Sequence, residues 1–188
     1  MIVVKDLQAT VLGEPLFEKV TLVIRPGERI AVVGANVGTF LRVLAGEDEA
    51  DRGTVVSEGE RIVYVSPEMF LEGNQSLGRL HHTRPTFVCF DATSTSASEA
   101  AVQDALRFIE GFRNGLLIAA TDTRLIKAAN VTRVFEIQAT TKTITSYTGN
   151  YTDFLTEQEK THSRINEAYE KQQKEKRRLE EWLEQKRT

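Results

Sequence analysis

The residues with the clearest chemical potential lie where a predicted buried strand ends. The apolar run 29–33 leads into Gly34-Ala-Asn-Val-Gly38-Thr39, and residues 40–45 then have the apolar spacing of a short helix. Glycines let a backbone approach a ligand closely, and the N-terminus of a helix attracts anions. The residues predicted from this pattern to contact a nucleotide are Gly34, Ala35, Asn36, Gly38 and Thr39.

The spacing of this segment departs from that of a phosphate loop. Such a loop has Gly, four residues, and then Gly-Lys followed by Ser or Thr. Here three residues separate Gly34 from Gly38, and no Lys follows. The alternative is a tight strand-to-helix turn that uses glycine for its backbone geometry. The missing Lys favours this alternative over tight binding of a triphosphate.

Two more predicted strands end in an acidic residue. Asp91 follows the apolar run 86–90, and Asp122 follows the apolar run 116–120. In parallel sheets, ligands bind at the carboxyl ends of the central strands. We therefore predict Asp91 as a Mg²⁺ position, with capping of the loop 93–96 as an equal alternative. For Asp122, capping of a helix at 123–129 explains the residue better than a second metal ligand does.

Cysteine and histidine add no further site. Cys89 is the single cysteine and lies inside an apolar run, so we predict a core residue without a disulfide. No Cys/His set has the spacing of a zinc finger. His81 and His82 follow one another in a predicted loop, where exposure to solvent is commoner than metal binding.

Strand-like runs alternate with helical patterns over residues 2–147. Strands are predicted at 2–11, 16–24, 29–33, 55–56, 62–65, 86–90, 116–120, 134–138 and 142–147, helices at 40–45, 97–112 and 123–129, and a loop at 67–85. Fully apolar strands that alternate with helices indicate a parallel sheet covered on both faces. The hairpins at both ends add an antiparallel layer. The predicted fold class is therefore α/β, with a mainly parallel sheet.

Charge divides the chain into two predicted parts, 1–150 and 151–188. Residues 157–188 hold nine Lys/Arg and eight Asp/Glu without Gly or Pro, which predicts one long helix over 153–186. Its basic run predicts contacts to RNA phosphates through Lys171, Lys174, Arg177 and Arg178. The interspersed glutamates make a solvated helix face the alternative.

The predicted helix also carries sparse apolar residues at helical spacing. Ile165, Tyr169, Leu179 and Trp182 form one stripe, so self-association through this helix is a further hypothesis. No apolar run approaches the ~20 residues that span a bilayer. With 40% hydrophobic residues and a formal charge of −3, we expect a soluble, cytoplasmic protein without a membrane partner.

Several collinear segments resemble an ATP-binding cassette of the ABC-F class, a group of translation-associated ABC ATPases. The segments that carry the resemblance are 16–36, 41–47, 85–91, 132–137, 147–155, 168–175 and 178–182. The run Gly149-Asn-Tyr-Thr-Asp-Phe-Leu155, joined to a charged helix, distinguishes this class from transporter cassettes. The resemblance implies ATP and Mg²⁺ as cofactors, and a ribosome partner (rRNA or tRNA) reached through residues 151–188.

The departures from the family pattern fall on its catalytic positions. Counting from the segment 41–46 places Val37 at the family's phosphate-binding Lys, and Ala92 stands at the catalytic Glu. Pro67 stands at the Q-loop Gln, Ser98 near the D-loop Asp and Asp122 at the switch His. Between Glu68 and Asp91 the family has a helical subdomain and a Leu-Ser-Gly-Gly signature, of which Ser76-Leu-Gly78 is at most a remnant.

We therefore expect a single truncated, motif-degenerate cassette core with the start of a linker helix. The expected chain lacks the helical subdomain, has no catalytic residue and binds no cofactor tightly. Its function would be that of a ribosome-associated binding module. The alternatives are a weak ATPase that uses Gly34–Thr39 and Asp91, and a module that binds proteins through its helix.

Overall fold

The computed structural model describes residues 1–185, without the side chains of His81, His162, Glu175 and residues 179–185. The chain divides into two compact units between Tyr151 and Thr152. The first unit contains both β-sheets and six short helices, and the second is helical. Each unit is described by itself.

The centre of the first unit is a six-stranded sheet with the strand order β5-β6-β7-β3-β8-β9. Its strands are β3 (Arg29–Gly34), β5 (Ile62–Val65), β6 (Phe87–Ala92), β7 (Gly115–Ala120), β8 (Arg133–Ile137) and β9 (Ile144–Thr148). Neighbouring strands are parallel except β9, which runs antiparallel to β8. Cys89 of β6 is fully buried, as predicted, and burial raises the pKa of its thiol to about 12.

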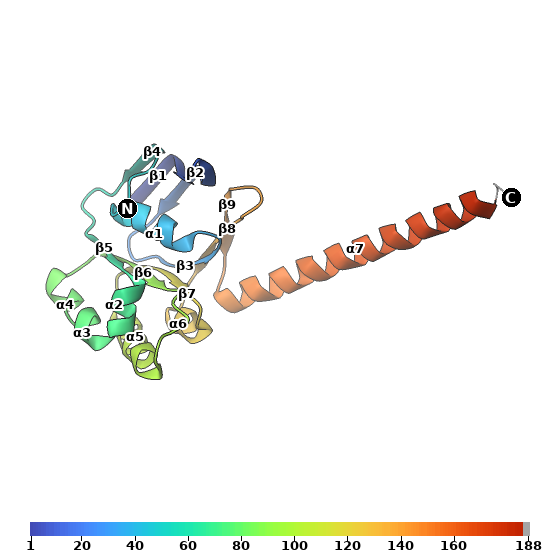
Figure 1. Cartoon of the computed structure of the whole chain (residues 1–188). Coiled ribbons are helices and arrows are strands. Elements are labelled where there is room, and N and C mark those ends of the chain that lie inside the picture. Colours follow the sequence, from blue (N-terminus) through green and yellow to red (C-terminus); the bar gives the residue numbers. More distant parts are fainter. Residues whose placement is uncertain (186–188) are drawn as a thin grey trace. The chain divides into compact units, whose positions relative to one another are not determined.

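A second, three-stranded antiparallel sheet has the order β2-β1-β4. It consists of β1 (Ile2–Val11), β2 (Glu14–Ile24) and β4 (Arg52–Val56). Helix α1 (Val37–Ala45) lies between the two sheets (Figure 1). Its Phe40 ring contacts Phe17 of β2 edge to face at 5.6 Å and Phe135 of β8 at 6.5 Å. One aromatic side chain thus joins both sheets in a common core.

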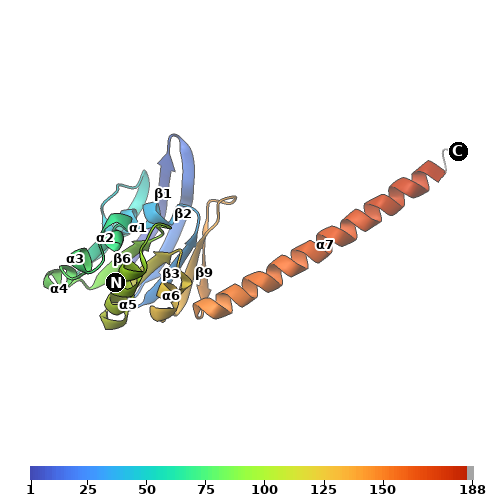
Figure 2. The ribbon, with the colours of Figure 1, turned by 60° about the horizontal axis from the view of Figure 1, so that its bottom comes forward.

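The other face of the large sheet is covered by short helices (Figure 2). They are α2 (Pro67–Glu72), α3 (Asn74–Leu77), α4 (Leu80–Thr83), α5 (Glu99–Gly111) and α6 (Thr123–Ala128). The predicted loop at 67–85 is wrong, because this segment forms α2 to α4. Ser66 caps α2 with Pro67 in its first turn, and Phe70 packs at 6.1 Å against Phe90 of β6. Leu77 of α3 and Leu80 of α4 are also buried, so each of the three helices packs an apolar side chain into the core.

The predicted fold class is confirmed: an α/β core with a mainly parallel sheet, an added antiparallel sheet and a long C-terminal helix. That helix, α7 (Tyr151–Gln185), has 35 residues. Ile165 and Tyr169 are 59% and 62% exposed. The side chains of Leu179 and Trp182, also predicted in the apolar stripe, lie outside the described residues. Within the described part of the chain, no helix combines the length and hydropathy that crossing a membrane requires.

Arg29, the first residue of β3, connects this strand to the C-terminal ends of two helices. Its guanidinium donates hydrogen bonds to the carbonyl oxygens of Ile109 and Phe112, at the end of α5. A third bond, at 2.5 Å, goes to the carbonyl oxygen of Ala129, which follows α6. Burial, and then the nearby charge of Arg113, lower the pKa of Arg29. The last carbonyls of a helix have no partner inside it, so one side chain completes two helix ends.

Replacing Arg29 by Ala should destabilise the protein by about 3 kcal/mol, because three backbone acceptors lose a charged donor in a half-buried place. Urea unfolding followed by circular dichroism measures this change. Arg113→Ala is the matched control, since it removes an exposed Arg nearby and should change stability by less than ~0.5 kcal/mol. Equal losses in the two variants would contradict the capping role of Arg29.

Candidate functional site

The candidate nucleotide segment forms a tight turn between β3 and α1. Gly34 has a φ of +98°, and a Cβ on it would lie 2.2 Å from the carbonyl oxygen of Ile137 in β8. The amide of Ala35 donates to this same oxygen at 3.0 Å. Asn36 is in the left-handed conformation with a φ of 54°, and its side chain makes no capping hydrogen bond. The strand-to-helix turn proposed as the alternative is therefore present, and only glycine fits at position 34.

The structure brings this turn and Asp91 together. Asp91 lies in β6 and is 2% exposed. A Cβ on Gly38, in the first turn of α1, would lie 2.7 Å from its Oδ2 atom. The Asp91 carboxylate therefore packs directly on the backbone of this turn, where the positive end of the helix dipole stabilises a negative charge.

Hydrogen bonds from the protein hold both oxygens of Asp91. The Tyr64 hydroxyl of β5 donates to Oδ2 at 3.1 Å, and the amide and hydroxyl of Thr93 donate to Oδ1 at 3.1 and 2.6 Å. Burial, and then the charge of Asp91, raise the pKa of Tyr64 to about 12, which keeps this hydroxyl a donor. Asp91 therefore caps the loop after β6, which is one of its two predicted roles.

A cation next to the turn was not predicted from the sequence. Arg42, one turn after Gly38 on α1, donates to the Thr39 hydroxyl at 3.2 Å and to Oδ2 of Asp48 at 2.7 Å. The hydrogen bond to Asp48 is the largest of the influences that raise the pKa of Arg42. The spacing of three residues from Thr39 to Arg42 is the sequence signal that could have indicated this pair.

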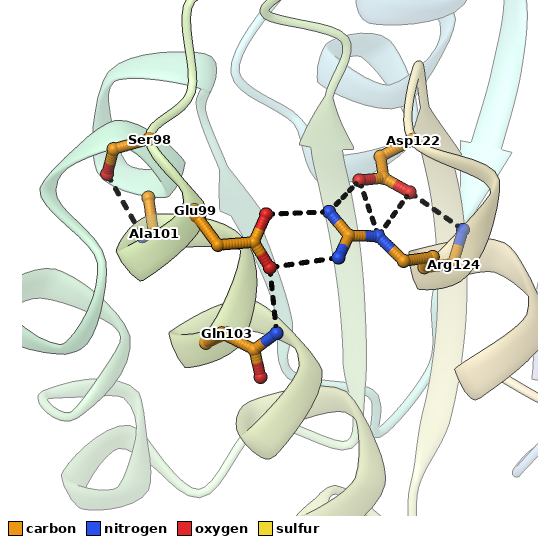
Figure 3. A network of polar contacts seen from close by, with 6 residues as sticks. All are labelled: Ser98, Glu99, Ala101, Gln103, Asp122 and Arg124. Atoms are coloured by element: carbon orange, nitrogen blue, oxygen red, sulfur yellow. Dashed lines mark hydrogen bonds and ion pairs between the residues drawn. The ribbon is translucent and has the colours of Figure 1, made fainter.

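Asp122 makes different contacts, shown in Figure 3. It caps α6 by accepting the amide of Arg124 at 2.9 Å, and it also accepts from the Arg124 guanidinium. The same guanidinium donates two hydrogen bonds, at 2.9 and 3.0 Å, to Glu99 at the start of α5. The predicted capping role of Asp122 is thus observed. Over the residues that the structure describes, no three His, Cys, Asp or Glu side chains are grouped to hold a metal ion.

The predicted RNA contacts lie on α7. Lys171, Lys174, Arg177 and Arg178 are all exposed. Lys171, Lys174 and Arg178 follow one another at steps of three and four residues, which places them along one helix face. The structure thus presents them to solvent on a regular helix.

Comparisons with known proteins relate the chain to ATP-binding cassettes. The profile of a family described as "ABC transporter" matches residues 137–188. The lipoprotein-releasing system ATP-binding protein LolD of Coxiella burnetii is 39% identical over 83 residues, which cover 40% of this chain and 36% of LolD. The ATP-binding protein Uup of Caulobacter vibrioides is 37% identical over 82 residues, which cover 41% of this chain and 14% of Uup. The chain thus matches a minor part of each relative's length.

Solved structures show the same fold. A bacterial ABC transporter cassette solved as a dimer superposes with a TM-score of 0.61 at 12% identity, covering 79% of this chain and 98% of that chain. A nucleotide-free ATP-binding cassette from an ABC transporter gives 0.59 at 14% identity, covering 80% and 92%. The chain therefore has the ATP-binding cassette fold, and its sequence is similar to ABC ATP-binding proteins.

Replacing Gly38 by Ala should cost about 1–3 kcal/mol of stability, because the new Cβ requires the buried Asp91 carboxylate to move. The cost should be about 1 kcal/mol smaller in an Asp91→Ala background, where this neighbour is absent. Urea unfolding of the two single variants and the double variant measures the difference. The control is Gly111→Ala at the end of α5, where a Cβ would meet no atom within 4 Å. Additive losses for Gly38 and Asp91 would contradict the contact.

The Glu99–Arg124 pair predicts a pH dependence of stability. Arg124, first, and then Gln103 lower the pKa of Glu99 to about 2. Because the folded-state pKa lies below the unfolded one of about 4.3, the stabilisation is complete above pH ~4.3 and is lost as the pH falls toward 2. Glu99→Gln should therefore be less stable than the parent protein at pH 7, with the gap closing toward pH 2.

Urea unfolding at pH 7, 4 and 2.5 measures this gap. Glu110→Gln, at an exposed position of the same helix, is the control and should show little change at pH 7. A gap for Glu99→Gln that stays constant with pH would contradict the ion pair.

Proposed function

We propose that this chain is an ABC-F-like cassette that serves as a ribosome-associated binding module and does not hydrolyse ATP. The observation that carries this proposal is the contact of Asp91 with Gly38. The Asp91 carboxylate lies between the first turn of α1 and β6. It accepts hydrogen bonds from the hydroxyls of Tyr64 and Thr93. We infer from this contact that the cassette acts through its surface.

The residues at the turn do not match the needs of ATP and Mg²⁺. Phosphate loops supply a Lys to the β- and γ-phosphates, whereas Val37 stands at this position and Arg42 is engaged with Asp48 and Thr39. Ala92, at the end of β6, has no group that could orient a water molecule. Positioning and electrostatic stabilisation supply the catalysis of phosphoryl transfer, and the side chains of Val37 and Ala92 provide neither.

Helix α7 supplies the surface for a partner. Its exposed cations can neutralise RNA phosphates, and an interaction of this kind weakens with salt. The family match over residues 137–188, the similarity to Uup and the exit run Gly149–Leu155 support the ABC-F class. The ribosome is the partner that the resemblance to this class implies.

Weak ATP binding is the second candidate function. It is favoured by the position of the turn Gly34–Thr39, which lies between the central strand β3 and helix α1, beside Asp91. Nucleotide sites of α/β proteins lie at such strand ends. In this case Asp91→Ala should change the binding of Mg-ATP in equilibrium dialysis. Binding that is absent, or unaffected by the substitution, leaves the first proposal.

Association with ribosomes should be sensitive to salt and independent of ATP. Neutralising about three phosphates predicts a loss of affinity of roughly 20- to 40-fold between about 50 and 200 mM salt. The triple variant Lys171→Gln, Lys174→Gln, Arg178→Gln should lose most of this salt dependence, because it removes the cations along one helix face. Filter binding with ribosomes and with naked rRNA, each with and without Mg-ATP, measures the effect.

The control removes three exposed cations from the first unit by Arg79→Gln, Arg113→Gln and Lys127→Gln. It has the same net charge as the α7 variant and should bind like the parent protein. If the two triple variants lose affinity equally, binding follows net charge and α7 has no specific role. If the parent protein shows no association that salt weakens, the ribosome proposal is wrong.

A further inference from the structure

The outer face of the three-stranded sheet carries an apolar row across its strands. Val3 of β1 is paired in register with Val23 of β2 and with Val56 of β4, so the three side chains point to the same face. Val23 and Val56 are each 42% exposed, whereas the neighbouring residues Ile2 and Val4 are fully buried on the opposite face. The solvent side of an antiparallel sheet is usually polar, so this row is unusual.

Two opposite charges lie beyond one end of strands β2 and β4, and a hollow lies beside the apolar row. Arg25 and Glu58 lie two residues beyond Val23 and Val56, and both are exposed. Among the described residues, neither side chain is seen in an ion pair. On the β4 side, a hollow of about 310 Å³ is lined by Met1, Val3, Lys5, Val56 and Glu58. The β2 side therefore carries an apolar side chain and a cation, Arg25. The hollow on the β4 side is lined by an anion, Glu58, and also by the exposed Lys5 of β1.

We propose that this face binds the same face of a second copy of the chain, about a twofold axis parallel to β1. Such an axis places the β2 side of one copy over the β4 side of the other. Val23 of each copy then enters the hollow of its partner, and Arg25 of each copy meets the partner's Glu58. A twofold interface must be complementary to itself in this reciprocal way.

The charges of this face indicate which partner it binds, and its size indicates how tightly. A partner with one uniform charge would match either Arg25 or Glu58 and oppose the other, whereas a second copy satisfies both. Three strands at about 4.8 Å spacing and five residues at about 3.3 Å give a footprint of roughly 230 Å². Standard interfaces bury about 800 Å² per partner, so the dimer should be weak and form at high micromolar concentration.

Sedimentation equilibrium of the full chain, from about 10 μM to 1 mM, tests the proposal. The average mass should rise toward that of a dimer with concentration, and Val23→Glu should abolish the rise. Arg25→Glu and Glu58→Arg should each raise the dissociation constant about tenfold, because each places like charges opposite one another. The double variant Arg25→Glu, Glu58→Arg should return it to within about threefold of the parent value, because the pair is restored with its charges exchanged.

Two controls separate this face from other modes of association. Glu110→Arg makes the same charge reversal on α5 and should leave the dimer unchanged, and so should Ile165→Ser with Tyr169→Ser on α7. Far-UV circular dichroism verifies that each variant is folded. A chain that stays monomeric up to 1 mM overturns the proposal. It is also overturned by a dimer that only the α7 variant weakens, or by a double charge exchange that fails to restore association.

Discussion

The Arg29 guanidinium is the group on which the arrangement of the core depends. It joins the start of β3, the strand that leads into the turn at Gly34, to the C-terminal ends of α5 and α6. At the opposite ends of the same two helices, Arg124 connects Glu99 with Asp122. An arginine therefore fixes each end of both helices. The loops that connect β6 to α5 and β7 to α6 are positioned by the same contacts.

Much of the core was predictable because burial leaves a plain signal in the sequence. The strands β3, β6 and β7 appear as short apolar runs, since helices or a second sheet cover both of their faces. Helices α2 to α4 were missed because they have only four to six residues each and Gly73, Gly78 and Pro85 in the same segment indicate a loop. Ser66 caps α2 locally, whereas the burial of Phe70, Leu77 and Leu80 is a tertiary feature.

The candidate site was predictable only in outline. Strand topology indicated that Asp91 and the turn after β3 would share one edge of the sheet, and they do. The sequence gives no measure of how closely they pack, so the contact of Asp91 with Gly38 had to come from the structure. Arg29 was missed because its partners lie 80 to 100 residues away along the chain. Arg42 was missed although its partners, Thr39 and Asp48, are close to it in the sequence.

The length of α7 sets a scale for anything that binds it. At a rise of about 1.5 Å per residue, its 35 residues extend for about 52 Å, more than the thickness of a lipid bilayer. Lys171 and Arg178 are then about 30 and 40 Å along the helix axis from Tyr151. Along its own axis the helix therefore holds these cations at a fixed distance from Tyr151, and inserting or deleting a single turn would change this distance by about 5 Å.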